Sequence, residues 1–244
     1  MQRRLIFMGV AIALVISWIS WSGLTQAAPL TTPRVHPLPA SLTQWADTDD
    51  DYFSEIRPTP LGYLVWSQFP VKVYIAQITG ADRSLSEAEQ SRFQEWQAAI
   101  GQAVQEWNQY LPLQLVDRPE DADIVIWRSF PAQQASRDPE TGILEIPRAS
   151  AAQTRYQFYL QQPERRLAHR FTIHLSPNQT NLYTLATARH ELGHALGIWG
   201  HSPAPTDVMY FAQVSQPPAI SPRDVNTLKR IYSQPTQLGW RVGQ

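Results

Sequence analysis

Three of the six histidines in the 244-residue sequence lie within twelve residues, and their spacing would suit metal chemistry. His190 and His194 are four residues apart, so on a helix their imidazoles would share one face and could bind one metal ion. Glu191 directly follows His190, and its carboxylate could contact a metal-bound water. This is the HExxH pattern, in which two imidazoles hold Zn²⁺ and the glutamate acts as general base.

Such a metal ion needs a third protein ligand, and the sequence narrows the choice. No glutamate follows Glu191, which excludes a glutamate from a later helix. Gly197 can take the positive φ that ends a helix, and His201 follows it closely. We therefore expect His201 to be the third ligand of one zinc ion, with a water in the fourth position. If His201 does not bind, Asp207 is the next candidate.

The segment resembles the active site of the metzincin zinc peptidases, whose motif is HExxHxxGxxH followed by a methionine-containing turn, the Met-turn. Within that clan it is most similar to the matrixins, the branch that includes the matrix metalloproteinases. Ser202 follows the third histidine as in matrixins, and Met209-Tyr210 comes eight residues after His201. The chain departs from the motif in one respect, because three residues rather than two separate Gly197 from His201.

The resemblance implies a zinc-dependent endopeptidase that acts on proteins or peptides. The oligomeric state stays open, with a monomer as the default. It implies these roles: His190, His194 and His201 as zinc ligands, Glu191 as general base, Met209 as the floor beneath the imidazoles, and Tyr210 in the wall of the substrate pocket. The calcium loops of matrixins have no evident match, so structural calcium stays open. Two other functions also stay open: a zinc-binding or regulatory domain without turnover, and an amidase that acts on cell-wall peptides.

Composition limits the domain organisation and the kinds of partner that the chain can have. With 43% apolar and 17% charged residues, the chain suits one ordinary domain with extensions. A net charge of −1 gives no indication of a nucleic-acid partner. Cysteine is absent, which excludes disulfides and also the cysteine with which matrixin pro-segments block the zinc.

Residues 1–27 have the features of a targeting segment. Arg3 and Arg4 precede an uncharged run from Leu5 to Leu24, and small residues follow, as in an export signal. The run is also long enough to span a bilayer, so a retained membrane anchor is the alternative. In both cases we expect the rest of the chain to lie outside the cytoplasm, as a secreted, periplasmic or membrane-anchored protein.

Residues 28–61 are rich in proline and carry an acidic cluster. The prolines disfavour regular structure, and the cluster comprises Asp47, Asp49, Asp50, Asp51 and Glu55. We expect a solvated linker here. The alternative is a pro-segment in which a carboxylate covers the zinc, as in some metzincins.

The catalytic domain is expected over 62–235, with a C-terminal tail over 236–244. Its expected elements are strands at 71–75, 113–116 and 122–127, a helix capped by Ser86, a surface loop at 128–150, a hairpin of 154–160 with 167–175, a helix from 181 through the HExxH motif with Leu182 on its buried side, and a last helix starting at Ser221-Pro222.

The order of these elements predicts an α+β fold whose upper part is of α/β type. Strand, long helix, strand and strand in succession imply crossovers and a largely parallel, twisted mixed sheet. By resemblance, the strand at 154–160 is the antiparallel edge of the sheet above the zinc. An extended substrate could add to such an edge as a further strand.

Overall fold

The computed structural model describes residues 30–46, 50–78, 85–131, 136–137, 144–145 and 151–243, so the expected targeting segment, Asp47 and Asp49 lie outside the described residues. The elements are α1 (Ala40–Gln44), η1 (Phe53–Glu55), β1 (Val71–Ile75), α2 (Glu87–Trp107), β2 (Leu113–Val116), η3 (Pro119–Asp121), β3 (Ile124–Arg128), β4 (Ser136–Arg137), β5 (Leu144–Glu145), β6 (Ala152–Gln161), β7 (Arg166–Leu175), α3 (Asn181–Ala195) and α4 (Pro222–Tyr232). No helix among these residues is long and apolar enough to cross a bilayer.

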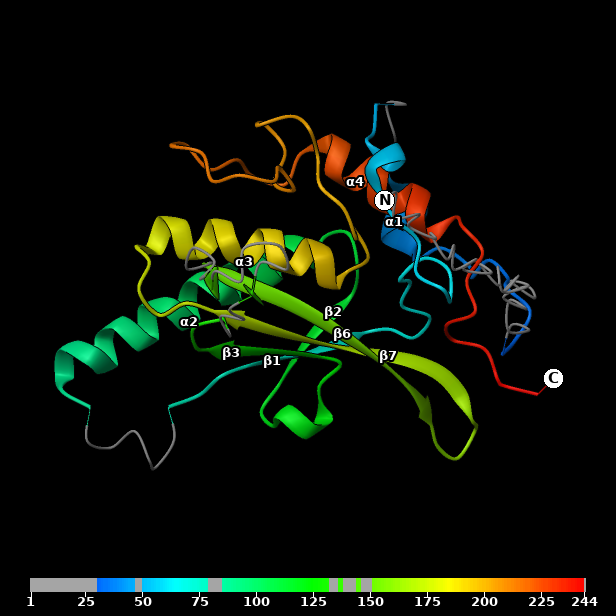
Figure 1. Cartoon of the computed structure of the whole chain (residues 1–244), viewed down its shortest axis with the longest axis horizontal. Coiled ribbons are helices and arrows are strands. Elements are labelled where there is room, and N and C mark those ends of the chain that lie inside the picture. Colours follow the sequence, from blue (N-terminus) through cyan, green and yellow to red (C-terminus); the bar gives the residue numbers. More distant parts are fainter. Residues whose placement is uncertain are drawn as a thin grey trace, which may run out of the picture.

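Five strands form one mixed sheet in the order β2-β1-β3-β7-β6. β1 pairs in parallel with both β2 and β3, and β3 pairs in parallel with β7. β6 is antiparallel to β7 and forms the edge of the sheet. The predicted α+β class, the largely parallel sheet and the antiparallel edge strand are therefore confirmed. Helices α2 and α3 pack against each other on one face of this sheet (Figure 1).

The long helix α2 forms where its sequence predicts it. The Ser86 side chain accepts a hydrogen bond from the Glu89 N–H, and the Glu89 carboxylate accepts one from the Ser86 N–H at 2.8 Å, which completes a capping box. Its buried stripe consists of Phe93, Trp96, Ala99, Ile100, Ala103, Val104 and Trp107. At its end the Trp107 indole N–H donates to the Arg189 carbonyl at 2.8 Å, so α2 directly supports α3.

Two expectations about local structure differ from what is observed. Residues 136–137 and 144–145 pair as the short antiparallel ladder of β4 and β5, so the 128–150 segment is not wholly a loop. Leu182 is 53% exposed rather than buried. The buried face of α3 runs instead through Thr184, Ala188 and Leu192. Leu182 precedes Ala188 by six residues, which places it about 120° around the helix from that face.

The described part of residues 28–61 packs on the domain instead of forming a solvated linker. Leu42, Tyr52 and Ile56 belong to the hydrophobic core of the described domain. Two of the described acidic residues face helix α4, since Asp50 pairs with Arg223 at 3.0 Å and Asp51 with Arg230 at 2.9 Å. We call residues 50–57 the strap.

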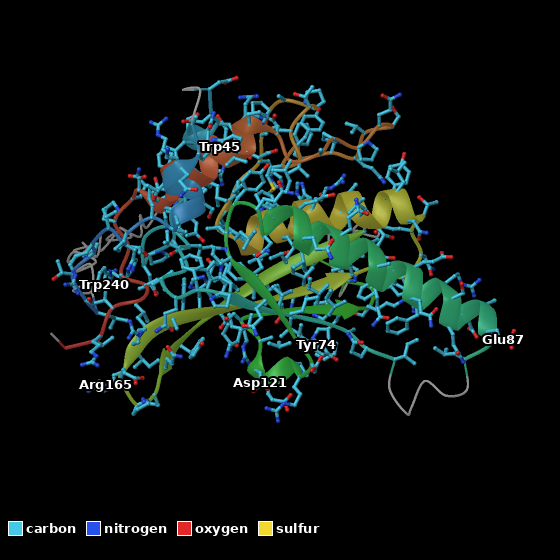
Figure 2. All side chains as sticks on the ribbon, turned by 180° about the vertical axis from the view of Figure 1, so that it is seen from behind. Trp45, Tyr74, Glu87, Asp121, Arg165 and Trp240 are labelled. Carbon is cyan, nitrogen blue, oxygen red and sulfur yellow. The ribbon has the colours of Figure 1, made fainter. Side chains whose placement is uncertain are left out.

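The residues after α4 also belong to the folded unit and are not a free tail. Thr236 and Leu238 are fully buried. Arg34 and Thr236 exchange two backbone hydrogen bonds of 3.0 Å, so the two ends of the described chain run side by side. Figure 2 labels Trp45 and Trp240 on this side of the molecule, with Glu87 at the opposite end. The packed domain therefore extends beyond 62–235 in both directions.

Candidate metal centre

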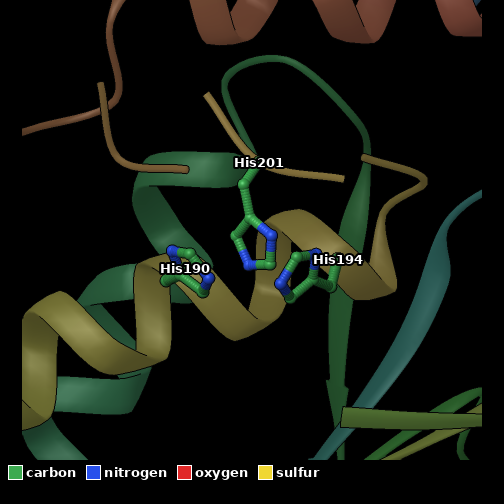
Figure 3. Close-up of side chains that lie close together, drawn as sticks. All are labelled: His190, His194 and His201. Atoms are coloured by element: carbon green, nitrogen blue, oxygen red, sulfur yellow. The ribbon is translucent and has the colours of Figure 1, made fainter. Parts of the chain in front are cut away.

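The structure brings together the three histidines singled out in the sequence. His190 and His194 extend from α3, and His201 reaches down from the loop that follows it (Figure 3). One ring nitrogen of each lies within 4.8 Å of the corresponding nitrogens of the other two. The ring centroids are 4.7–5.2 Å apart. Three nitrogen donors converging in this way suit the tetrahedral coordination of zinc, with a fourth position left for water.

Backbone carbonyls fix the tautomers of the two helical histidines. His190 Nδ1 lies 2.9 Å from the Val208 carbonyl oxygen, and His194 Nδ1 lies 2.8 Å from that of Ile198. A carbonyl can only accept, so each Nδ1 carries the hydrogen and each Nε2 keeps its lone pair for a metal. Burial lowers the pKa of His194 well below its ordinary value, and burial also lowers the pKa of His201. Neutral imidazoles of this kind are the form that binds zinc.

The loop between α3 and His201 explains how the extra residue is accommodated. Gly197 ends the helix with φ +127°, and a side chain there would meet the Leu64 carbonyl oxygen at 2.5 Å. At Gly200 a Cβ would lie 2.3 Å from the Glu55 carbonyl oxygen. The Arg57 N–H donates to the Trp199 carbonyl at 3.2 Å. The loop therefore lies directly against the strap, and only glycine fits at the point of closest approach.

Met209 lies beneath the helix that carries the first two histidines. It is fully buried, and a Cβ at Gly193 would come within 2.2 Å of its sulfur atom. The turn around Met209 is held by Asp224 of α4, whose carboxylate accepts the N–H groups of Val208 at 3.0 Å and Met209 at 3.4 Å. The Tyr52 hydroxyl of the strap donates to the same carboxylate at 2.6 Å.

Asp207, the alternative third ligand, is engaged elsewhere in this structure. Its carboxylate accepts hydrogen bonds from the Ser202 and Ser221 hydroxyls and pairs with Arg223 at 3.0 Å. Its side chain is 1% exposed, and it is not part of the converging group. The carboxylate oxygens thus fix the turn between His201 and α4, which leaves His201 as the residue that completes the cluster.

Glu191 lies beside the histidines and is almost completely buried, with 9% of its surface exposed. The Thr154 hydroxyl, from the start of β6, donates to its carboxylate. Burial raises the pKa of Glu191, whereas His190 and the Thr154 hydroxyl lower it. A buried carboxylate with a raised pKa is a stronger proton acceptor than an ordinary glutamate, which suits a general base. No pattern in the sequence marked Thr154, because a threonine within an alternating strand is common.

Two hollows meet at Glu191. The smaller, of about 190 Å³, lies beside His190 and has Tyr210 in its wall, together with Val214, Pro217 and Pro218. The larger, of about 570 Å³, lies beside His194 and His201. Ala152 and Glu191 border both, so the cleft runs along the start of β6 with the glutamate at its centre.

The fold and this histidine cluster define a metzincin-type catalytic domain. The Matrixin family, Peptidase_M10, matches residues 82–233, which is more than half of the chain. The chain therefore belongs to the matrixin family, a family of zinc metallopeptidases. No curated protein matches the sequence. The strap precedes the matched region and is an addition to it.

Proposed function

We propose that this protein is a zinc-dependent endopeptidase that uses His190, His194 and His201 as metal ligands and Glu191 as general base. The observation that carries the proposal is the convergence of three imidazole nitrogens beside a buried carboxylate. When bound, zinc would lower the pKa of a water towards about 7 and polarise the scissile carbonyl.

The proton transfers are assigned to Glu191. It accepts the proton of the attacking water and delivers it to the leaving amine, which is a general base followed by a general acid step. The Thr154 hydroxyl holds the carboxylate in place by its hydrogen bond. The Val208 and Ile198 carbonyls keep the first two imidazoles oriented.

The substrate main chain is assigned to the edge of β6. Within the described sheet this strand pairs with β7 alone, so its other side could accept an extended peptide as a further strand. The hollow lined by Tyr210 is suited to one apolar side chain of the substrate. Main-chain pairing along β6 supports an endopeptidase, because it needs no free terminus.

We also propose that the protein is exported. Arg3 and Arg4 followed by the uncharged run support a cleaved signal or a retained anchor over residues 1–27. Mass spectrometry of the amino terminus of the mature protein would distinguish the two.

Glu191→Gln tests the proposed chemistry. The amide cannot accept the proton of the water, so cleavage of a mixed peptide library should fall by about 10²–10⁴-fold while zinc content and circular dichroism stay unchanged. Glu120→Gln, on the exposed η3 segment, is the matched control and should retain full activity. Cleavage at the parent rate by zinc-loaded Glu191→Gln would refute the mechanism.

A further inference from the structure

The larger hollow beside His201 has a charged wall that comes from the strap. Glu55 and Arg57 line it together with Glu191, His194 and His201. Both charged side chains are exposed to solvent, whereas Ile56 between them is buried. Ile56 therefore anchors this part of the strap in the core and leaves its two charged neighbours at the border of the cleft.

Within the part of the chain that the structure describes, these two charges have no oppositely charged partner. Elsewhere in the strap, Asp50 and Asp51 are paired with arginines of α4. Among the described residues, neither Glu55 nor Arg57 has an ion pair, and Glu55 receives only a 3.4 Å hydrogen bond from Ser54. A carboxylate and a guanidinium thus remain available to a molecule that enters the cleft.

The strap holds the backbone of Glu55 and Arg57 in place at the border of the cleft. The Tyr52 N–H donates to the Thr227 hydroxyl at 3.0 Å, which fixes one end of the strap to α4. At the other end the Arg57 N–H donates to the Trp199 carbonyl. The backbone at Glu55 lies against Gly200. Because the backbone is ordered before binding, a ligand that pairs with these side chains does not have to order the strap as well.

The direction of β6 indicates which half of a substrate would meet this wall. β6 starts at Ala152, between the two hollows, and continues to Tyr156, whose ring contacts that of Trp199 at 5.0 Å. The strand therefore runs towards the side of the cleft that carries the strap. A peptide added antiparallel to β6 would place its amino-terminal half beside Glu55 and Arg57.

We infer that Glu55 and Arg57 determine specificity by pairing with charged side chains on the amino side of the scissile bond, an inference that rests on the proposed peptidase function. Arg57 would favour an acidic residue, since its guanidinium can bind a carboxylate through two hydrogen bonds. Glu55 would favour a basic residue. The strap lies outside the residues that match the family, so this preference would come from a segment that the family domain does not include.

Matched peptides test the inference on the full, zinc-loaded chain. Each set varies one of the four residues before the scissile bond among Glu, Gln and Lys. At one position the parent should cleave the Glu peptide about five- to tenfold better than the Gln peptide, as measured by kcat/KM. Arg57→Gln should remove that preference and leave the Gln peptide within about twofold of the parent rate. Glu55→Gln should likewise remove a preference for the Lys peptide over the Gln peptide.

Arg92→Gln and Glu87→Gln are matched controls, because both residues are exposed on α2 and neither lines the cleft. They should leave both preferences intact. Preferences that persist in Arg57→Gln and Glu55→Gln would overturn the inference. So would charge preferences confined to the carboxyl side of the bond.

A binding measurement separates this inference from the proposed catalysis. Fluorescence anisotropy of labelled Glu, Gln and Lys peptides with Glu191→Gln protein needs no turnover. The same preferences should appear there and should be lost when Arg57→Gln or Glu55→Gln is added. If the parent cleaves no peptide but this pattern holds, the proposed function fails and the inference stands; equal binding of all three peptides would overturn the inference.

Discussion

The contact between Gly193 and Met209 gives the most specific prediction about the fold of the site. Gly193 lies within α3, between Glu191 and His194. An alanine Cβ there would lie 2.2 Å from the Met209 sulfur and 3.3 Å from Cζ2 of Trp107. Both neighbours are fully buried, so neither can move aside freely. Gly193→Ala should therefore force the helix and the Met-turn apart.

The size of the effect follows from two opposing terms. Replacing a helical glycine with alanine normally stabilises by about 0.5–1 kcal/mol. Overpacking a filled core costs about 1–3 kcal/mol. The direct overlap with Met209 places Gly193→Ala at the upper end of the overpacking range, so the net loss of stability after the helix gain is about 2–2.5 kcal/mol. Gly101→Ala is the control, because nothing lies within 4 Å of its Cβ position in α2. Gly101→Ala should raise the free energy of unfolding by about 0.5–1 kcal/mol.

Urea unfolding of chelator-treated protein measures both changes. The two glycine-to-alanine substitutions should shift the midpoint in opposite directions. Zinc competition titrations should also show weaker binding in Gly193→Ala, because the carbonyl of Val208, beside Met209, orients His190. A Gly193→Ala protein that is as stable as Gly101→Ala and binds zinc like the parent would refute this account of the Met-turn.

Two further predictions concern buried polar groups. Tyr52→Phe removes the hydroxyl that donates to the buried Asp224, so it should lower the free energy of unfolding by about 1–3 kcal/mol. The control is Tyr63→Phe, which should change stability little because Tyr63 is half-buried and makes no such bond. Equal losses of the two variants in urea unfolding would contradict this. The second prediction concerns His169, whose pKa burial lowers to about 3. Below about pH 6.5 the unfolded chain therefore binds a proton at His169 that the folded chain does not. The contribution of His169 to stability should then fall by about 1.4 kcal/mol per pH unit down to about pH 3. His169→Leu should reduce this slope between about pH 6 and 4, and an unchanged slope would contradict the assignment.

Local patterns made much of the fold predictable. Ser86 with Glu89, and Ser221 with Pro222, mark the starts of α2 and α4, because capping depends on residues that are close in sequence. The alternating apolar residues of β7 likewise identified a strand with one buried face. The histidine spacing anticipated which side chains converge, since a helix fixes the first two and Gly197 allows the turn to the third.

The strap and the residues that hold the Met-turn could not be predicted in this way. Prolines and acidic residues disfavour helices and strands, but they do not prevent packing when arginines of α4 supply the opposite charges. Tyr52 and Asp224 meet across 172 residues of sequence. Leu182 follows the helical period but lies off the packed face. Contacts of this kind depend on tertiary arrangement, which local periodicity does not encode.

Zinc-edge X-ray absorption on the purified protein and on His201→Ala tests the central claim most directly. The parent should hold one zinc with three imidazole nitrogens at about 2.0–2.1 Å and one oxygen. His201→Ala should bind zinc much more weakly and show two imidazoles in any zinc that remains. A parent spectrum with two imidazoles, unchanged in His201→Ala, would contradict the three-histidine centre.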